Sequence, residues 1–302
     1  MMFYLSLASI FALGYLAQTT GLCMVRGVKQ TMLGKPMFLI SILFSGTLAW
    51  ISMGAAEWFG TQDGTHAYWP NAYSFIGGLL FGLGASVNGG CGVSTVSRFA
   101  RGELVMFSTM SGWLFGWLLF LPMFPISDSK TELVLFGERQ YLLLIPLTVV
   151  IFIKIYSMRP DYRKLWLSML GIGLMAGVVF VTEPNWTPSG LLQSISSSLW
   201  YQNESSWPAW SRFVLVISML MGMISAAFFT RSFDLRWFNL KVAIRHLFAG
   251  IFMGCGASIA GGGNDSQLLV AMPSLSLAGL ATVASIVVGI FLGLKMFSRA
   301  SI

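Results

Sequence analysis

The feature that most constrains this chain is a glycine-rich stretch that occurs twice, 172 residues apart. The first copy spans residues 78–94 and the second spans residues 250–266. An internal repeat of this kind predicts a protein built from two related halves. Because consecutive glycines interrupt an apolar segment in each copy, we expect a helix break in each half. Eight of the seventeen aligned positions are identical: Gly78/Gly250, Gly82/Gly254, Gly84/Gly256, Ala85/Ala257, Ser86/Ser258, Gly89/Gly261, Gly90/Gly262 and Ser94/Ser266.

The composition excludes a soluble domain. Of the 302 residues, 56% are hydrophobic and only 10% are charged, and the mean hydropathy is +0.75, whereas soluble domains carry roughly 25% charged residues. The predicted fold class is an all-α polytopic membrane protein, because helices satisfy their own backbone polar groups in lipid. Two of the predicted segments, 73–87 and 246–260, are shorter than the roughly 20 residues that a full crossing needs. The nine predicted segments are 3–18, 37–56, 73–87, 104–121, 140–157, 165–182, 211–230, 246–260 and 275–297.

Basic residues set the predicted orientation. If the N-terminus is outside and every segment crosses, fifteen of the eighteen basic residues fall on one side, which the positive-inside rule assigns to the cytoplasm. The C-terminus is then cytoplasmic, and the expected location is a bacterial inner membrane. The sequence pI of 9.5 is attributed to these loops, and no nucleic-acid partner is expected. The fifteen residues are Arg26, Lys29, Lys35, Arg98, Arg101, Lys154, Arg159, Arg163, Lys164, Arg231, Arg236, Lys241, Arg245, Lys295 and Arg299.

An odd number of crossings inverts the second half relative to the first. Each half contributes four segments, and the fifth segment links them. Inverted repeats with glycine-interrupted segments at matching positions are typical of transporters, whose substrate site lies at the breaks. The predicted units are a first half, a linking helix and a second half at residues 1–139, 140–163 and 164–302.

A second, weaker internal repeat predicts a further helix break in each half. Residues 18–23 and 187–192 each follow an apolar run, and Gly21 and Gly190 match at a spacing of 169. Together with the strong repeat, this weaker repeat predicts two helix breaks in each half.

The glycines of the repeat have two different interpretations. Small residues four apart let membrane helices pack closely, which is the preferred interpretation for Gly78, Gly82, Gly112, Gly116, Gly250, Gly254, Gly289 and Gly293. Unwound backbone at membrane depth, however, occurs only where it is buried in protein or lines a cavity. We therefore place in the substrate pathway the residues around the consecutive glycines, namely Gly89, Gly90, Gly92, Gly261, Gly262 and Gly263.

Ser94 and Ser266 lie just beyond the two breaks, where a new half-helix is expected to begin. Ordinary capping by serine explains them, but a helix N-terminus also offers N–H groups and partial positive charge to an anion. Asn264 and Asp265 lie at the second break on the outward side. An ionisable residue at membrane depth is a functional candidate, and contact with external water is the alternative for Asp265.

Two of the three cysteines lie at predicted breaks. A free cysteine is ordinarily a small buried apolar residue, but Cys23 and Cys91 each directly follow a glycine-containing break. We interpret them as protonated thiols in an apolar constriction, while Cys255 is a further pathway candidate. No metal or other cofactor is expected, because His66 and His246 are assigned to opposite faces and zinc usually takes four ligands.

At these residues the chain resembles the YeeE/YedE family of sulfur transporters. The likeness covers most of the chain and is strongest at residues 82–92 and 254–268. The resemblance implies nine membrane helices in inverted halves, an hourglass shape, and a relay of cysteine thiols that hydrogen-bond thiosulfate as it passes. Cys23 and Cys91 stand at two relay positions, but the third position is Gly263 in this sequence. A related sulfur or selenium species would fit that departure equally well.

The sequence therefore predicts a transporter or channel-like permease for a small sulfur-containing anion, thiosulfate foremost, and not an enzyme. Cys23 and Cys91 would contact the anion, and Arg98 and Arg101 would draw it toward the cytoplasm. One alternative is a membrane-embedded sulfur-relay subunit that carries a Cys91 persulfide to a cytoplasmic sulfurtransferase-like protein. The other is a scaffold that transports nothing.

Overall fold

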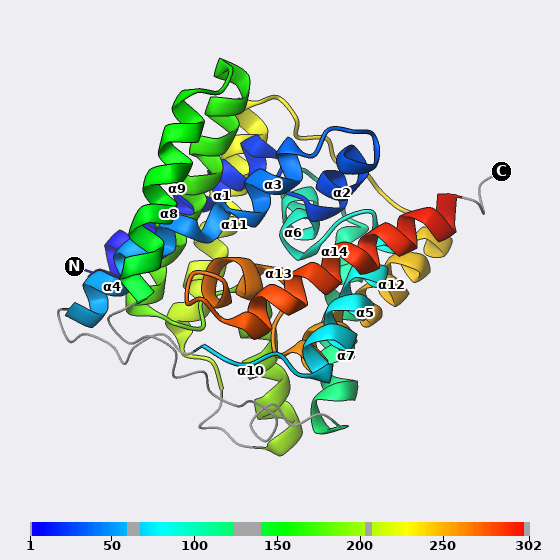
Figure 1. The fold of residues 1–302 in the computed structure, drawn as a ribbon. Coiled ribbons are helices and arrows are strands. Elements are labelled where there is room, and N and C mark those ends of the chain that lie inside the picture. The colour runs from blue at the N-terminus through cyan, green and yellow to red at the C-terminus, as the bar shows by residue number, and fades with distance from the viewer. Residues whose placement is uncertain (1, 59–66, 124–139, 203–206, 299–302) are drawn as a thin grey trace.

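The computed structural model describes residues 2–58, 67–123, 140–202 and 207–298 (Figure 1). Within these ranges the regular secondary structure is helical, and Glu103 and Arg236 form an isolated β-bridge. His66 and Arg299 lie outside the described residues. The α-helices are α1 (Met2–Thr20), α2 (Met24–Met32), α3 (Met37–Leu43), α4 (Ala49–Trp58), α5 (Ala72–Asn88), α6 (Gly92–Ala100), α7 (Met106–Phe120), α8 (Gln140–Tyr156), α9 (Pro160–Thr182), α10 (Pro188–Tyr201), α11 (Trp210–Phe229), α12 (Leu240–Ala260), α13 (Asn264–Ser266) and α14 (Leu277–Ser298). Tighter or wider turns form η1 (Ser45–Leu48), η2 (Leu121–Met123) and η5 (Gln267–Ala271).

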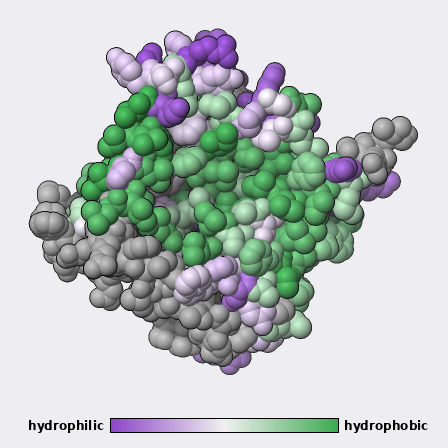
Figure 2. All heavy atoms as spheres, in the orientation of Figure 1, coloured by the Kyte–Doolittle hydropathy of each residue, from purple (hydrophilic) through white to green (hydrophobic). Residues whose placement is uncertain are grey.

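The chain is an all-α polytopic membrane protein, as predicted. Seven helices of the described residues are long and apolar enough to cross a bilayer, and two shorter apolar helices span Met37–Ser52 and Leu142–Tyr156. All nine predicted segments fall on helical stretches, although nine complete crossings remain a prediction. Figure 2 shows the expected surface, in which a broad hydrophobic band separates hydrophilic residues at the two ends of the molecule.

The expectation that segment 246–260 is short is wrong. Helix α12 begins at Leu240 and has 21 residues, which is enough for a full crossing. Lys241 and Arg245 lie in its first turns, so a pattern based on hydropathy begins too late. The side chain of Asn239 caps this start, because its Oδ1 accepts the Val242 N–H at 2.9 Å.

The two helices that carry the glycine repeat pack against each other in opposite directions. A Cβ atom at Gly84 would lie 2.8 Å from the Ala249 carbonyl oxygen, and one at Gly256 would lie 2.6 Å from the Gly77 carbonyl oxygen. Residue numbers therefore rise along α5 as they fall along α12. These two contacts are related by the same 172-residue shift as the sequence repeat. The helix pair is thus antiparallel, and its two contacts are equivalent.

Each repeat helix also packs in parallel against the last long helix of the other half. Gly78 and Gly82 of α5 face the carbonyl groups of Thr282 and Ile286 in α14. The matching positions of α12, Gly250 and Gly254, face the carbonyl groups of Thr109 and Trp113 in α7. A side chain at any of these four glycines would collide with backbone atoms. The packing interpretation of these glycines is therefore confirmed.

The remaining long helices follow the same scheme on the other side of the molecule. Helix α1 packs antiparallel to α9, with Ser6 and Thr182 hydrogen-bonded through their side chains at 2.7 Å. Helix α1 also packs on α11, and α9 packs on α4 and η1. The short helices lie between these groups of long helices. In Figure 1, α6 and α13 occupy the middle of the molecule, with α2 above them and α10 below.

Candidate functional site

The first predicted break is present between α5 and α6. Helix α5 ends at Asn88, and Gly89 takes the left-handed conformation with φ 70°, which glycine adopts without steric strain. The Gly90 N–H donates to the Ala85 carbonyl at 3.1 Å and closes the end of the helix. Cys91 is extended, with φ −80° and ψ −177°, and α6 begins at the next residue.

The second break follows the same backbone path. Gly261 ends α12 with φ 70°, and the Gly262 N–H donates to the Ala257 carbonyl at 2.8 Å. Gly263 is extended, with φ −79° and ψ −178°, so it occupies the position of Cys91. Both predicted breaks are therefore present, and their left-handed glycines and extended residues match at the 172-residue shift of the sequence repeat.

The two breaks meet at equivalent residues. The Gly92 N–H donates to Asn264 Oδ1 at 3.1 Å, and these two positions are 172 residues apart. The Trp113 indole lies against both breaks, because Cβ atoms at Gly92 and Gly263 would lie 2.7 and 3.0 Å from its ring atoms. The point at which the two halves meet is thus a contact between repeat positions, backed by one aromatic side chain.

The break in the first half carries two thiols. Cys23 immediately precedes α2, as Cys91 immediately precedes α6, and the two thiols lie next to each other. The Ser94 Oγ donates to the Cys91 carbonyl at 3.1 Å and to Cys91 Sγ at 3.6 Å. Backbone N–H groups of Arg26 and Met24 also point at the two sulfur atoms. Cys91 is only 1% exposed and both cysteines are free thiols.

The break in the second half carries hydroxyl groups instead. Thr187 precedes α10, and its Oγ1 accepts the Gly190 N–H at 3.1 Å. The Ser266 Oγ lies 2.7 Å from both Thr187 Oγ1 and Ser189 Oγ. Ser266 is the repeat partner of Ser94, and each of the two serines bonds the residue that precedes a helix. We call Cys23, Cys91 and Ser94 the sulfur tip, and Thr187, Gly263 and Ser266 the hydroxyl tip.

The predicted register of the weaker repeat is wrong, although a second helix break is present in each half. Cys23 and Thr187 both cap a short helix and are 164 residues apart, so Gly190 lies inside α10 and is no counterpart of Gly21. Gly21 is left-handed with φ 67°, whereas Gly190 has an ordinary helical position. The signal that locates the helix start is Thr187 followed by Pro188, a favoured cap and a favoured first residue.

Asp265 is buried beside the hydroxyl tip and does not reach external water, since it is 2% exposed. Its Oδ2 accepts the Ser189 N–H at 2.9 Å, and the Ser266 N–H also faces the carboxylate. Its Oδ1 makes no hydrogen bond with any described residue. One oxygen of this buried carboxylate therefore has no hydrogen-bond partner among the described residues.

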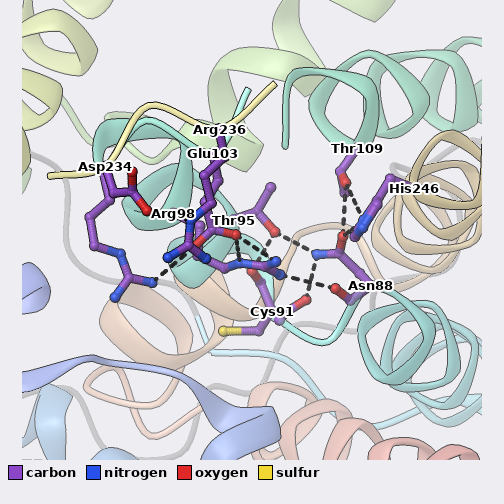
Figure 3. Close-up of polar contacts among 11 residues, drawn as sticks. Asn88, Cys91, Thr95, Arg98, Glu103, Thr109, Asp234, Arg236 and His246 are labelled. Atoms are coloured by element: carbon purple, nitrogen blue, oxygen red, sulfur yellow. Dashed lines mark hydrogen bonds and ion pairs between the residues drawn. The ribbon is translucent and has the colours of Figure 1, made fainter. Parts of the chain in front are cut away.

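Asn88, which no sequence pattern singled out, supports the sulfur tip on the side away from the Cys91 sulfur (Figure 3). Its Nδ2 donates to the Gly90 carbonyl at 2.9 Å and to Thr95 Oγ1 at 2.8 Å. Its Oδ1 lies 2.8 Å from both Thr109 Oγ1 and His246 Nδ1. One amide thus joins α5, α6, α7 and α12. In Figure 3 the Cys91 sulfur points away from this network.

Arg98, a predicted exit residue, belongs to the same supporting region. It donates to the Asn88 carbonyl at 3.1 Å and pairs with Glu103 at 2.7 Å. Arg101 lies 3.6 Å from Glu103 and is partly exposed. The loop before α12 joins this cluster, because the Arg236 N–H donates to the Gly102 carbonyl at 2.9 Å. Loops predicted to be cytoplasmic therefore pair with each other, and Arg98 is already engaged in holding the end of α5.

Cys255 does not join the two tips. It lies within α12 next to Gly116 of α7, is buried, and is not among the partners found for the tip residues. Within the described part of the chain, no group of three His, Cys, Asp or Glu residues could hold a metal ion.

A buried arginine beside α10 was also missed. Arg212 is 6% exposed, donates twice to the Asn185 carbonyl, and lies 3.8 Å from Glu183. Its position beside α10 depends on contacts distant in sequence.

Comparison with known proteins adds one finding. A family model described as "Sulphur transport" matches residues 20–292, which is most of the chain and includes both tips. No match was found among curated proteins.

Proposed function

Since this chain belongs to the sulphur transport family, which the YeeE/YedE resemblance had anticipated, we propose that it is a permease for a small sulfur-containing anion. The anion passes between the sulfur tip and the hydroxyl tip at the centre of two inverted halves. Thiosulfate is the first member of this class to test. The proposed setting is a bacterial inner membrane with the N-terminus outside and the C-terminus cytoplasmic.

The observation that carries this proposal is the meeting of four short helices at their N-terminal ends. The residues that precede α2, α6, α10 and α13 are Cys23, Cys91, Thr187 and Gly263. Three of these, all but Thr187, cap their helix without a side-chain hydrogen bond. Helix N-termini expose N–H donors and partial positive charge, which attract an anion. Discontinuous helices that point at the substrate are a general feature of transporters built from repeats.

The sulfur tip gives this anion site a suitable chemistry. Thiols donate weak hydrogen bonds and are polarizable, so they match a sulfur-bearing anion without holding it tightly. Rapid passage requires binding that is favourable but weak. Ser94 bonds Cys91 and keeps the thiol at the start of α6, in the region where the two halves meet.

The test is uptake of labelled thiosulfate into proteoliposomes or into cells that lack other sulfur permeases. Cys91→Ala removes the central thiol and should lower the uptake rate about tenfold, the equivalent of one hydrogen bond of about 1.4 kcal/mol. Cys255→Ala is the matched control, because it removes a thiol that lies away from both tips. Wild-type uptake by the Cys91→Ala variant would remove the thiol from the mechanism, and absence of uptake by the wild-type protein would remove thiosulfate.

The sulfur-relay alternative is less favoured by the structure. A persulfide on Cys91 would have to reach a soluble sulfurtransferase-like protein, yet this residue is only 1% exposed and lies next to Cys23. A persulfide-trapping reagent that labelled Cys91 in intact membranes, together with undetectable uptake, would favour the relay over the permease.

A further inference from the structure

The carboxylate of Asp265 occupies the place of a missing thiol. Gly263 is the repeat position of Cys91, and both residues have the same extended backbone conformation. A Cβ atom at Gly263 would lie 2.7 Å from Asp265 Oδ1 and 3.0 Å from the Trp113 ring. The space that a side chain at position 263 would fill is therefore taken by this carboxylate oxygen. Where the first half presents a donor, the second half presents an acceptor.

The carboxylate is fixed in this place from the other side. Its Oδ2 accepts the Ser189 N–H at 2.9 Å, which ties it to the first turn of α10. The Ser266 N–H and the Ser189 hydroxyl also face it. With one oxygen bound to α10, the other is directed toward Gly263.

The free oxygen is too deeply buried to be satisfied by bulk water. Asp265 is 2% exposed, and its Oδ1 makes no hydrogen bond with any residue that the structure describes. An unsatisfied acceptor in such a position is costly, and more so when it is charged. A donor that arrives with the substrate would relieve this cost at the moment of passage.

We propose that Asp265 is a specificity-determining residue which accepts a hydrogen bond from an S–H group of the permeating anion. This inference rests on the proposed function and, within its substrate class, gives preference to monoanions that carry an S–H donor, of which hydrosulfide is the smallest. The sulfur lone pairs of such an anion face Cys23, Cys91 and the N–H groups of α2 and α6. Its S–H group faces Asp265.

Fully deprotonated dianions fit this arrangement less well. Thiosulfate at neutral pH carries acceptors only, so it cannot satisfy Asp265 Oδ1. An ionised carboxylate would also repel a doubly charged anion more strongly than a singly charged one in a region of low dielectric constant. Discrimination by an unpaired or repelling group is a general route to specificity. A thiol at position 263 would have offered a donor to the dianion, and this sequence has none there.

Transport currents from proteoliposomes on solid-supported membranes test the inference, with sodium hydrosulfide and sodium thiosulfate as probes at mildly alkaline pH. Neutral hydrogen sulfide crosses lipid but carries no current. In Asp265→Asn, the amide oxygen can still accept the Ser189 N–H while the amide NH₂ replaces Oδ1. The ratio of hydrosulfide current to thiosulfate current should then fall about tenfold or more, as for one lost hydrogen bond to a charged group.

Two further variants control for folding and for charge. Asp265→Ser, whose hydroxyl both donates and accepts, should give an intermediate ratio. Asp234→Asn removes an equal charge from an exposed loop and should leave the ratio unchanged. An unchanged ratio in a folded Asp265→Asn protein would overturn the inference and leave the permease in place. Absence of current for both probes in the wild-type protein would overturn the proposed function itself.

Discussion

The sulfur tip and the hydroxyl tip have one backbone path but different side-chain chemistry. Gly89 and Gly261 share φ 70°, and Cys91 and Gly263 share an extended conformation. The first tip presents two thiols, whereas the second presents hydroxyl groups and a carboxylate oxygen. The difference teaches that glycine spacing specifies where the helices break, while the residues around the break decide what the site recognises.

The two tips are also held in place differently. Asn88 braces the sulfur tip through four hydrogen bonds. Its repeat position in the second half is Ala260, whose side chain cannot hydrogen-bond. The hydroxyl tip is fixed instead through Ser266 and Asp265, which bind the first turn of α10. Loss of a brace should therefore have unequal effects in the two halves.

The largest expected effect on stability comes from Asn88→Ala. Four hydrogen bonds among α5, α6, α7 and α12 are lost, and at about 0.6 kcal/mol for each bond in a membrane protein the total is about 2 kcal/mol. Thermal unfolding of purified protein in detergent measures this loss. Ser266→Ala, which breaks two hydrogen bonds, is the matched variant and should cost about half as much. Equal losses for the two variants would contradict the unequal bracing.

The next effect tests the shared backbone. Gly89→Ala and Gly261→Ala each force a Cβ atom into the left-handed region and should each lower the free energy of unfolding by about 1–2 kcal/mol. A Cβ at Gly89 meets only a distant atom of Arg98, at 3.9 Å, so strain and not collision causes the loss. Chemical or thermal denaturation of both variants provides the comparison. A difference larger than the individual losses would show that the two breaks are not equivalent.

A smaller effect is expected where the tips touch. Asn264→Ala leaves the buried Gly92 N–H without its acceptor and should cost about 1 kcal/mol. Asn264→Ser keeps an acceptor oxygen without adding a charge beside Asp265 and should lose less stability than Asn264→Ala. Melting temperatures of the two variants, measured side by side, provide the comparison. A loss in Asn264→Ser equal to that in Asn264→Ala would argue that the contact between the halves is unimportant for stability.

The mildest change makes the two tips more alike. Thr187→Cys replaces the Oγ1 that bonds Ser266 with a sulfur atom and keeps a donor of similar size. Thiosulfate uptake should stay within about twofold of wild type, because a weak neutral hydrogen bond is exchanged for another of under about 1 kcal/mol. Loss of uptake in a folded variant would show that the hydroxyl itself is needed at this tip.

The positions of the main breaks could be predicted from the sequence, because consecutive glycines in an apolar helix have few other uses. The thiols at Cys23 and Cys91 could be chosen because each follows a glycine break. The roles of Asn88 and Arg212 could not be predicted. A single polar residue in an apolar segment looks the same in the sequence whichever residues its side chain contacts in the fold. The Asn88 partners Thr109 and His246 are 21 and 158 residues away. The start of α10 could have been predicted from Thr187 and Pro188. Aligning Gly190 with Gly21 instead placed the weaker repeat in the wrong register.

The hydrogen bond between Gly92 and Asn264 joins two positions that the repeat makes equivalent. A link between equivalent positions lies on the axis that relates the two halves. The two breaks cannot separate at this point without losing that hydrogen bond. Any movement of one half against the other that keeps the bond intact must therefore pivot close to it.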